Sequence, residues 1–271
     1  MKKNYTTVLT IAGSDSSGGA GIQADIKTFA ALECFGLSVI TALTAQNTTG
    51  VNAIYPLDEE CIRDQFRSIS TDISIDAVKI GMLGSAAAIK TVSALLSELK
   101  GNHPVILDTV LASTGGTPLL PSNAIPLLKE ELFPLTSLIT PNIPESALLT
   151  GMNYAPVSPE EIEETAAKLL ETGTASVLVK GGHSEGEECR DCLLYDNRFF
   201  WFSSKKIMTG NTHGTGCTLS SAIAAFMARG ESMDSAVAKA KAYVDEALLA
   251  GAAYSFGNGS GPLQHFYRFW Q

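Results

Sequence analysis

Residues 7–43, TVLTIAGSDSSGGAGIQADIKTFAALECFGLSVITAL, join two short apolar runs through a glycine-rich turn and a helical pattern. The first run, Thr7–Ala12, is typical of a buried strand, and Leu37–Leu43 predicts a second one. Between them, the apolar spacing of residues 22–29 predicts a helix that ends at Gly36. A strand, a helix and a further strand in this order indicate a βαβ unit with parallel strands.

The same alternation continues along the chain. Further strand-like runs are Val51–Tyr55, Ala77–Met82, Val105–Asp108, Ser137–Thr140 and Ser176–Val179. Leu193–Trp201 predicts a small hairpin around Asp196-Asn197, which we interpret as a flap, and two long helices follow Thr218. No linker, repeat or low-complexity run interrupts this order. We therefore expect one domain over residues 1–271, with an α/β fold whose mostly parallel central sheet is flanked by helices on both faces.

Composition restricts the class of protein. The chain has 271 residues, of which 45% are hydrophobic, and its formal net charge is −9. An acidic chain lacks the basic surface that nucleic acid or an anionic membrane requires. Five scattered cysteines do not resemble a secreted disulfide framework, and no apolar stretch approaches the roughly 20 residues of a membrane span. We expect a soluble cytoplasmic protein with neither nucleic acid nor membrane as a partner.

Polar residues and glycines follow most of the predicted strands. The six strand ends are Gly13-Ser14-Asp15, Gln46-Asn47-Thr48, Gly81-Met82, Asp108-Thr109, Pro141-Asn142-Ile143-Pro144-Glu145 and Lys180-Gly181-Gly182-His183. Turn chemistry explains any one of them taken alone. In an open parallel sheet, however, ligands bind beyond the carboxyl ends of the strands. This edge of the sheet is therefore predicted to hold the active site.

A second glycine motif points to phosphoryl transfer. Residues 211–218, NTHGTGCT, lead directly into an apolar helix. Glycines at such a position let backbone N–H groups converge on an anion, and the helix dipole adds positive potential there. The alternative is a flexible loop before a core helix. The chain has no P-loop sequence, and the spacing of Gly18, Gly19 and Gly21 does not match a dinucleotide-binding fingerprint.

These motifs closely resemble the hydroxymethylpyrimidine/phosphomethylpyrimidine kinases of thiamine biosynthesis, which have a ribokinase-like fold. The resemblance runs from about Val8 to Gly261-Pro262 and is carried by residues 12–25, Thr44–Thr48, Lys79–Leu83, Thr140–Asn142 and residues 211–218. It implies that Mg-ATP phosphorylates the hydroxymethyl group of 4-amino-5-hydroxymethyl-2-methylpyrimidine. The same site is implied to phosphorylate the monophosphate again, giving the diphosphate. The resemblance also implies a homodimer.

The resemblance further implies a role for individual residues. Positions that contact the pyrimidine match Gly13, Asp25, Gln46 and Met82. ATP-binding positions match Asn142, Lys180 and Thr212, and acidic positions associated with Mg²⁺ match Asp108 and Glu145. The anion hole matches Gly214, Thr215 and Gly216, and the position of the catalytic base matches Cys217.

Cys217 is the most informative of these residues, because ribokinase-like sugar kinases usually carry an aspartate there. Helix N-termini lower the pKa of a cysteine and favour the thiolate. The sequence therefore predicts that Cys217 deprotonates or orients the substrate hydroxyl. The alternative is a buried cysteine that serves only as a small apolar residue.

Ordinary explanations remain open for several other positions. Asp25 could lie on a solvated helix face, and Met82 could be core packing. Glu145 could be a first-turn helix residue favoured by the dipole. Asp108 follows an apolar strand, where a carboxylate is costly unless it is paired or metal-bound. Mg²⁺ prefers such oxygen ligands together with phosphates.

Other functions fit less well. A pyridoxal or pyridoxine kinase also acts on a hydroxymethyl group of a small heteroaromatic ring, although Gln46 and Met82 favour the pyrimidine. A non-catalytic pyrimidine sensor would keep the pocket without turnover, and a sugar kinase would need more hydrogen-bonding side chains. The C-x-x-C pair Cys189 and Cys192 lacks the second pair that a structural zinc site requires.

Overall fold

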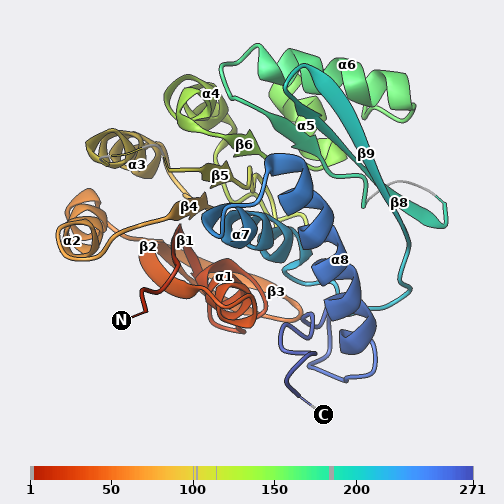
Figure 1. The fold of residues 1–271 in the computed structure, drawn as a ribbon, viewed down its shortest axis with the longest axis horizontal. Helices are drawn as coiled ribbons and strands as arrows, with labels where there is room; N and C mark the ends of the chain where they lie inside the picture. The colour runs from red at the N-terminus through yellow and green to blue at the C-terminus, as the bar shows by residue number, and fades with distance from the viewer. Residues whose placement is uncertain (1–2, 100, 102, 114, 183–185, 271) are drawn as a thin grey trace.

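The computed structural model describes residues 3–99, 101, 103–113, 115–182 and 186–270, and its centre is a nine-stranded sheet (Figure 1). The strands are β1 (Thr7–Asp15), β2 (Phe35–Asn47), β3 (Gly50–Pro56), β4 (Ala77–Ile80), β5 (Val105–Leu107), β6 (Leu138–Ile139), β7 (Val177–Val179), β8 (Glu188–Tyr195) and β9 (Arg198–Lys205). Their order across the sheet is β3-β2-β1-β4-β5-β6-β7-β8-β9.

The middle of this sheet is parallel and its two edges are antiparallel. β2, β1, β4, β5, β6 and β7 pair in parallel. β3 joins β2 antiparallel at one edge, and β8 and β9 continue antiparallel from β7 at the other. The prediction of a mostly parallel sheet is therefore confirmed.

Helices cover both faces of the sheet, as predicted. They are α1 (Gly21–Ala31), α2 (Glu59–Ser70), α3 (Ala86–Glu98), α4 (Ile125–Glu131), α5 (Ile143–Thr150), α6 (Pro159–Leu170), α7 (Thr215–Ala228) and α8 (Met233–Gly251). Figure 1 shows α1, α7 and α8 together on one face, while α2, α3, α4 and α6 lie on the other. Within the described residues, no helix combines the length and the apolar character that crossing a membrane requires.

The alternation of side chains along β1 explains why both faces are apolar. Leu9 and Ile11 belong to the core beneath α2 and α3, whereas Val8 belongs to the core beneath α1 and α7. Successive side chains of a strand point to opposite faces, so a run that is apolar throughout must be covered on both sides. The continuous apolar run of Thr7–Ala12 therefore requires the three-layer arrangement.

The end of the first helix differs from the prediction. α1 ends at Ala31, and Gly36 already belongs to β2. Glu33 adopts a left-handed conformation with φ 63°, and the N–H of Cys34 donates to the carbonyl of Phe29 at 2.8 Å. The chain thus turns out of the helix before the glycine, which lets Phe35 begin its pairing with β1.

The predicted hairpin is present, but it is longer and is part of the sheet. Its turn residues Asp196 and Asn197 both have positive φ, at 51° and 54°, as in a two-residue turn of type I′. Cys189 and Cys192 lie three residues apart on β8, so they point to opposite faces. Cys192 packs into the core, and the Cys189 sulfur lies 3.5 Å from Nζ of Lys241 on α8. The two cysteines therefore cannot bind one metal ion together, and β8 is a sheet strand rather than a flap.

His265 anchors the C-terminal segment to α7. Its Nε2 lies 3.0 Å from Thr218 Oγ1, and the Tyr243 hydroxyl donates to its backbone carbonyl at 2.8 Å. Burial, and then the nearby Lys27 ammonium, lower the pKa of His265 from 6.5 to about 4. Between about pH 4 and pH 6.5, the imidazole of His265 is therefore neutral in the folded protein and protonated in the unfolded chain.

We expect the free energy of unfolding to fall as the pH drops from about 6.5 to about 4. In this window the unfolded state takes up a proton that the folded state does not, which can remove up to about 3 kcal/mol of stability. His265→Gln keeps a neutral hydrogen-bonding group and should lose this part of the pH dependence. Urea unfolding at several pH values checks it, and identical pH profiles for the two proteins would contradict it.

Candidate active site

A cavity of about 610 Å³ lies at the carboxyl edge of the parallel strands. Each of the six parallel strands contributes a residue from its end to the lining, namely Asp15, Gln46, Met82, Asp108, Asn142 and Lys180. The prediction that these strand ends meet is therefore confirmed. His183, the last residue of the predicted set, lies outside the described residues.

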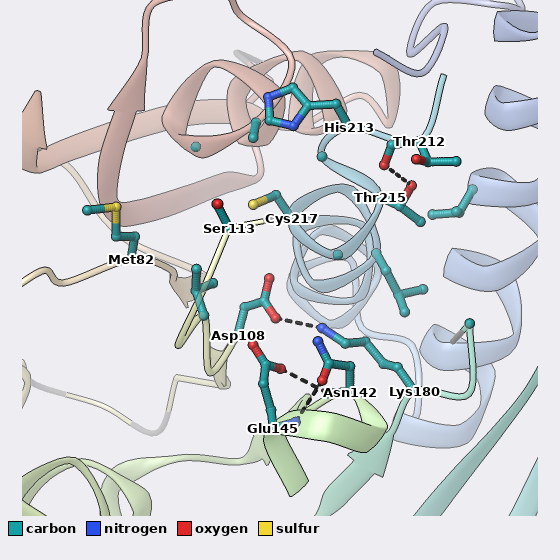
Figure 2. A pocket seen from close by; sticks show the side chains of 18 of the residues that line it. Met82, Asp108, Ser113, Asn142, Glu145, Lys180, Thr212, His213, Thr215 and Cys217 are labelled. Carbon is teal, nitrogen blue, oxygen red and sulfur yellow. Dashed lines mark hydrogen bonds and ion pairs between the residues drawn. The ribbon is translucent and has the colours of Figure 1, made fainter. Parts of the chain in front are cut away.

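Asp108 and Lys180 form an ion pair in this cavity (Figure 2). Lys180 Nζ donates to Asp108 Oδ1 at 2.8 Å, and the Thr140 hydroxyl donates to the same oxygen at 3.2 Å. Burial alone would raise the pKa of Asp108, but the ammonium groups of Lys180 and Lys79 hold it below its usual value. Both partners are therefore charged, and an ammonium and a carboxylate face the same cavity.

The donor set around Asp108 fits a hard cation bound through phosphates. Asp108 Oδ2 is less strongly hydrogen-bonded than Oδ1, since it accepts only a long hydrogen bond, from the Ser220 hydroxyl at 3.4 Å, among the described residues. Among the described residues, no cluster of three or more acidic, histidine or cysteine side chains could hold a metal by itself. Mg²⁺ is commonly held by one or two carboxylates plus substrate phosphates, so this arrangement suits that ion.

Glu145 acts as a helix cap in this structure. Its backbone N–H donates to the side chain of Asn142 at 2.8 Å, and its own carboxylate accepts from the N–H of Asn142 at 2.9 Å. This reciprocal pair is a capping box at the start of α5. Glu145 is therefore a first-turn helix residue, as the ordinary explanation predicted. The capping box accounts for the positions of the Asn142 and Glu145 side chains.

The carboxylate of Glu145 also holds a loop that the sequence analysis missed. It accepts from the Thr109 hydroxyl at 3.1 Å and from the N–H of Leu111 at 3.2 Å. The loop after Leu111 lines the cavity with mainly apolar residues, and Ser113 supplies a hydroxyl (Figure 2). Its mixture of small and apolar residues has no periodicity, so the sequence offered no signal for it.

The loop before α7 has the geometry of an anion site. Gly214 is the residue that precedes α7 and has φ 84°, and the first turn of the helix begins at Thr215. The first N–H groups of a helix have no partner within it and point out of its N-terminus. A Cβ atom on Gly216 would lie 3.3 Å from Lys180 Nζ and 3.5 Å from Asp108 Oδ2. The helix terminus therefore abuts the ion pair directly.

Cys217 lies in the first turn of α7, as predicted, and its side chain points into the cavity (Figure 2). The expected thiolate is wrong, however. Burial raises the pKa of Cys217 to about 11 despite the opposing charge of Lys79. The charges of Asp25 and Asp108 contribute to this raised pKa, so the helix terminus does not outweigh burial and two carboxylates. At neutral pH the group is a thiol.

We therefore expect Cys217 to react with iodoacetamide at least about tenfold more slowly at pH 7 than free N-acetylcysteine. Its rate should keep rising with pH up to about 10, because the thiolate fraction grows until the pH passes the pKa of about 11. Mass spectrometry of the peptide that carries Cys217 measures this rate, and Cys217→Ser identifies the signal. A rate that reaches a plateau below pH 8 would contradict the raised pKa.

Asp25 is the predicted site residue that the structure does not bring to the cavity. It is fully buried, accepts from Lys79 Nζ at 2.9 Å on both oxygens, and accepts from the Thr10 hydroxyl at 2.6 Å. Ser221 on α7 donates to it as well, at 2.7 Å. A solvated helix face is therefore wrong, and the structure places Asp25 behind the cavity wall, where it holds Lys79.

Lys79 itself lines the cavity and received no role from the sequence. Its side chain is fully buried, and Asp25 and Asp108 raise its pKa against the effect of burial. A Cβ atom on Gly81 would lie 2.8 Å from Nζ, so the glycine leaves room for the ammonium. A lysine inside the apolar run Ala77–Met82 was the signal that could have identified it.

The remaining predicted residues divide between two regions of the cavity. Gly13, Gln46 and Met82 form a wall, in which the N–H of Gly13 donates to the carbonyl of Met82 at 3.1 Å. Thr212 lies on the loop before α7 and Thr215 is the first residue of the helix, and the Thr215 hydroxyl donates to the carbonyl of Thr212 at 2.7 Å. The wall and the loop leave the Asp108–Lys180 pair between them.

One further part of the lining was not predicted. α8 contributes Lys241, Val244 and Leu248, which share one helix face, and β8 contributes Asp191. Lys241 Nζ donates to Asp191 Oδ2 at 2.7 Å. The sequence indicated the helix but could not show which strand it would face.

A helix N-terminus that faces a paired carboxylate and ammonium on a parallel sheet defines a small-molecule kinase site. A family model described as phosphomethylpyrimidine kinase matches residues 15–264. The chain is 44% identical over 262 residues to the hydroxymethylpyrimidine/phosphomethylpyrimidine kinase of Escherichia coli, which covers 97% of this chain and 98% of that protein. The chain therefore belongs to the phosphomethylpyrimidine kinase family.

A longer relative and two solved structures agree with this assignment. The chain is 45% identical to the thiamine biosynthesis bifunctional protein ThiED of Geobacter sulfurreducens, spanning 96% of this chain but 52% of that protein. An ADP complex of Bacillus subtilis pyridoxal kinase superposes with a TM-score of 0.89 at 33% identity, over 98% of this chain and all of that one. Phosphomethylpyrimidine kinase from Clostridium difficile 630 gives 0.78 at 41% identity, over 89% and 98%. The fold is ribokinase-like.

Proposed function

We propose that this chain transfers a phosphoryl group from ATP to the hydroxymethyl group of 4-amino-5-hydroxymethyl-2-methylpyrimidine, in thiamine biosynthesis. The same site then phosphorylates the monophosphate to the diphosphate. The observation that carries this proposal is the Asp108–Lys180 pair at the N-terminus of α7, with Gln46 and Met82 lining the same cavity. Family membership supports the choice of substrate.

Lys180, Asn142 and Thr212 bind the ATP phosphates in this proposal. The ammonium of Lys180 and the first N–H groups of α7 stabilise the negative charge that spreads over the transferred group. Asp108, with Glu145 beside it, would hold Mg²⁺, which would supply positive charge to neutralise the phosphates. The loop that Glu145 anchors at Thr109 and Leu111 excludes water from the cavity.

Gly13, Gln46 and Met82 bind the pyrimidine ring. The Met82 side chain offers an apolar surface to the ring, and the side-chain amide of Gln46 can donate to and accept from the ring edge. A Cβ atom on Gly13 would lie 3.1 Å from the Met82 sulfur, so a glycine at this position leaves room for the Met82 side chain. Asp25 contributes indirectly, because it lies behind the cavity wall and holds Lys79, which lines the cavity.

Cys217 orients the substrate hydroxyl as a neutral thiol. Phosphoryl transfer depends mainly on positioning and charge stabilisation, so the enzyme has little need of a permanently ionised base at this position. Cys217 then aligns the hydroxyl with the phosphoryl group that the α7 terminus holds.

The proposal includes one domain over residues 1–271, a homodimer and a cytoplasmic location. Exposed apolar side chains at the β2–β3 edge support a subunit contact, since Leu43 on β2 is 45% exposed and Tyr55, its partner on β3, is 61% exposed. Light scattering after size-exclusion chromatography tests the dimer. An average mass near that of one 28.6 kDa chain at micromolar concentration would contradict it.

Pyridoxal is the second candidate substrate, because the chain superposes on a pyridoxal kinase with a TM-score of 0.89. Coupled measurement of ADP release with each alcohol separates the two candidates. The expected kcat/KM for the pyrimidine exceeds that for pyridoxal by at least about 100-fold. Equal values would indicate a dual-specificity kinase, and pyrimidine binding without turnover would indicate a sensor. Asp108→Asn, which should lose turnover, is the control for contaminating kinases.

A further inference from the structure

His213 precedes the anion loop, and neither the sequence analysis nor the proposed function gives it a role. Its side chain lines the cavity and is mostly buried (Figure 2). The imidazole packs so closely against the glycine-rich loop that a Cβ atom on Gly19 would lie 2.4 Å from its Cδ2. Its Nε2 lies 2.8 Å from Asp15 Oδ2 and 3.2 Å from the side-chain amide of Gln46.

The contact with Asp15 determines where His213 carries a hydrogen. Burial would raise the pKa of Asp15, but hydrogen bonds from His213, from Ser17 and from the N–H of Ala20 lower it below its usual value. Asp15 is therefore a carboxylate, which only accepts hydrogen bonds. It follows that Nε2 of His213 carries a hydrogen and donates it to Asp15. This nitrogen has no lone pair left to accept a hydrogen bond from Gln46.

The orientation of the Gln46 amide follows from the same constraint. One end of the amide lies 3.2 Å from His213 Nε2, and the other lies 3.2 Å from Thr44 Oγ1. If the NH₂ end faced His213, two hydrogens would point at each other. The Thr44 hydroxyl would also have to donate its single hydrogen both to the Ser14 carbonyl, at 3.0 Å, and to the amide oxygen. Turning the amide by half a turn removes the clash of hydrogens and lets the Thr44 hydroxyl accept from the NH₂ group. The single Nε2 hydrogen of His213 is then shared between Asp15 Oδ2 at 2.8 Å and the Gln46 oxygen at 3.2 Å.

We propose that His213, held by Asp15, is a positioning residue that turns the carbonyl oxygen of Gln46 towards itself and the NH₂ group of Gln46 towards Thr44 and the substrate. One hydrogen of this NH₂ group is taken by the Thr44 hydroxyl, and the other is free for the ligand. The site therefore selects a heteroaromatic ring that presents an unprotonated ring nitrogen at this edge. This inference rests on the proposed function, because it assumes that Gln46 contacts the ring.

A double-mutant cycle measured by calorimetric binding of hydroxymethylpyrimidine, without ATP, tests this role. His213→Leu and Gln46→Leu should each weaken binding by about tenfold, the effect of one lost hydrogen bond. The double variant should bind no more weakly than Gln46→Leu, because His213 acts through Gln46. Losses that multiply instead would overturn the proposal.

Two conservative variants keep the test independent of folding. His213→Gln can place an N–H donor near the position of Nε2, so it should bind within about threefold of the wild type; a loss as large as that of His213→Leu would contradict the role. Gln46→Glu keeps acceptors towards His213 but has no NH₂ group. It should bind as weakly as Gln46→Leu, and wild-type binding by Gln46→Glu would overturn the deduced orientation.

Steady-state kinetics distinguish positioning of the substrate from damage to the anion loop. His213→Leu should raise the KM for the pyrimidine and leave the KM for ATP within about twofold; a larger rise for ATP would contradict the role. Turnover by the wild type tests the proposed function separately. If the wild type phosphorylates the pyrimidine but the losses of affinity in the double-mutant cycle multiply, only the role of His213 is overturned. A wild type that does not bind the pyrimidine overturns both.

Discussion

Gly214→Ala is expected to lower the kcat of the kinase reaction by more than about 100-fold, the scale of losing an oxyanion donor. Gly214 has φ 84°, a conformation that alanine rarely adopts, and a Cβ atom there would lie 1.8 Å from the carbonyl oxygen of Gly19. That oxygen belongs to the backbone of the glycine-rich loop and cannot rotate away. The substitution must therefore displace either this loop or the start of α7, and the N–H groups that we propose bind the phosphoryl group would move with it.

Gly210→Ala is the matched control for this variant. Gly210 lies four residues earlier on the same segment, and a Cβ atom there would contact nothing within 4 Å. Its kcat should stay within about twofold of the wild type, and circular dichroism should show that both variants are folded. If Gly214→Ala kept its kcat within threefold of the wild type, the anion loop could not be the main catalytic device.

Lys79→Met is expected to lower the free energy of unfolding by about 3–5 kcal/mol, the usual effect of removing one partner from a buried ion pair. Lys79 and Asp25 are both fully buried, and the ammonium meets both carboxylate oxygens at 2.9 Å. Methionine has a similar length but no charge. It would leave Asp25 in the core with only the hydroxyls of Thr10 and Ser221 as partners. Urea unfolding of the two proteins measures the difference.

Two further variants distinguish the effect of leaving a buried carboxylate unpaired from the effect of losing any basic side chain. Arg67→Met removes an exposed pair with Glu98 and should leave the free energy of unfolding close to that of the wild type. Adding Asp25→Leu to Lys79→Met removes the orphaned carboxylate and should recover part of the loss. A Lys79→Met variant within 1 kcal/mol of the wild type would show that Asp25 does not require the ion pair.

Most of the fold could be predicted from the sequence because its signals are local. Apolar runs such as Thr7–Ala12 show no polar alternation, which requires a sheet covered on both faces. The errors occurred where tertiary pairing decides a boundary. α1 ends at Ala31 because Phe35 must pair with β1. β8 begins at Glu188, before the predicted Leu193, because residues 188–192 pair with residues 201–205 of β9.

The prediction of the site succeeded for residues at the ends of strands and failed for residues whose properties depend on burial. Parallel strands bring their carboxyl ends together, so the positions of Asp108 and Lys180 followed from the order of the strands. The environment of Asp25 depends on Lys79, 54 residues away, which no local pattern reveals. The pKa of Cys217 was misjudged because a helix terminus is a local feature, whereas the opposing burial and carboxylates come from the whole fold.

Phosphorus NMR of the reaction products tests the central claim most directly. The purified protein is incubated with Mg-ATP and hydroxymethylpyrimidine, and the spectrum is followed over time beside the Asp108→Asn variant. We predict that a phosphomonoester signal appears first and is then replaced by the two signals of a diphosphate, while Asp108→Asn forms neither. ATP that remains intact, or a product that never passes beyond the monophosphate, would contradict a single site that phosphorylates both the alcohol and its phosphate.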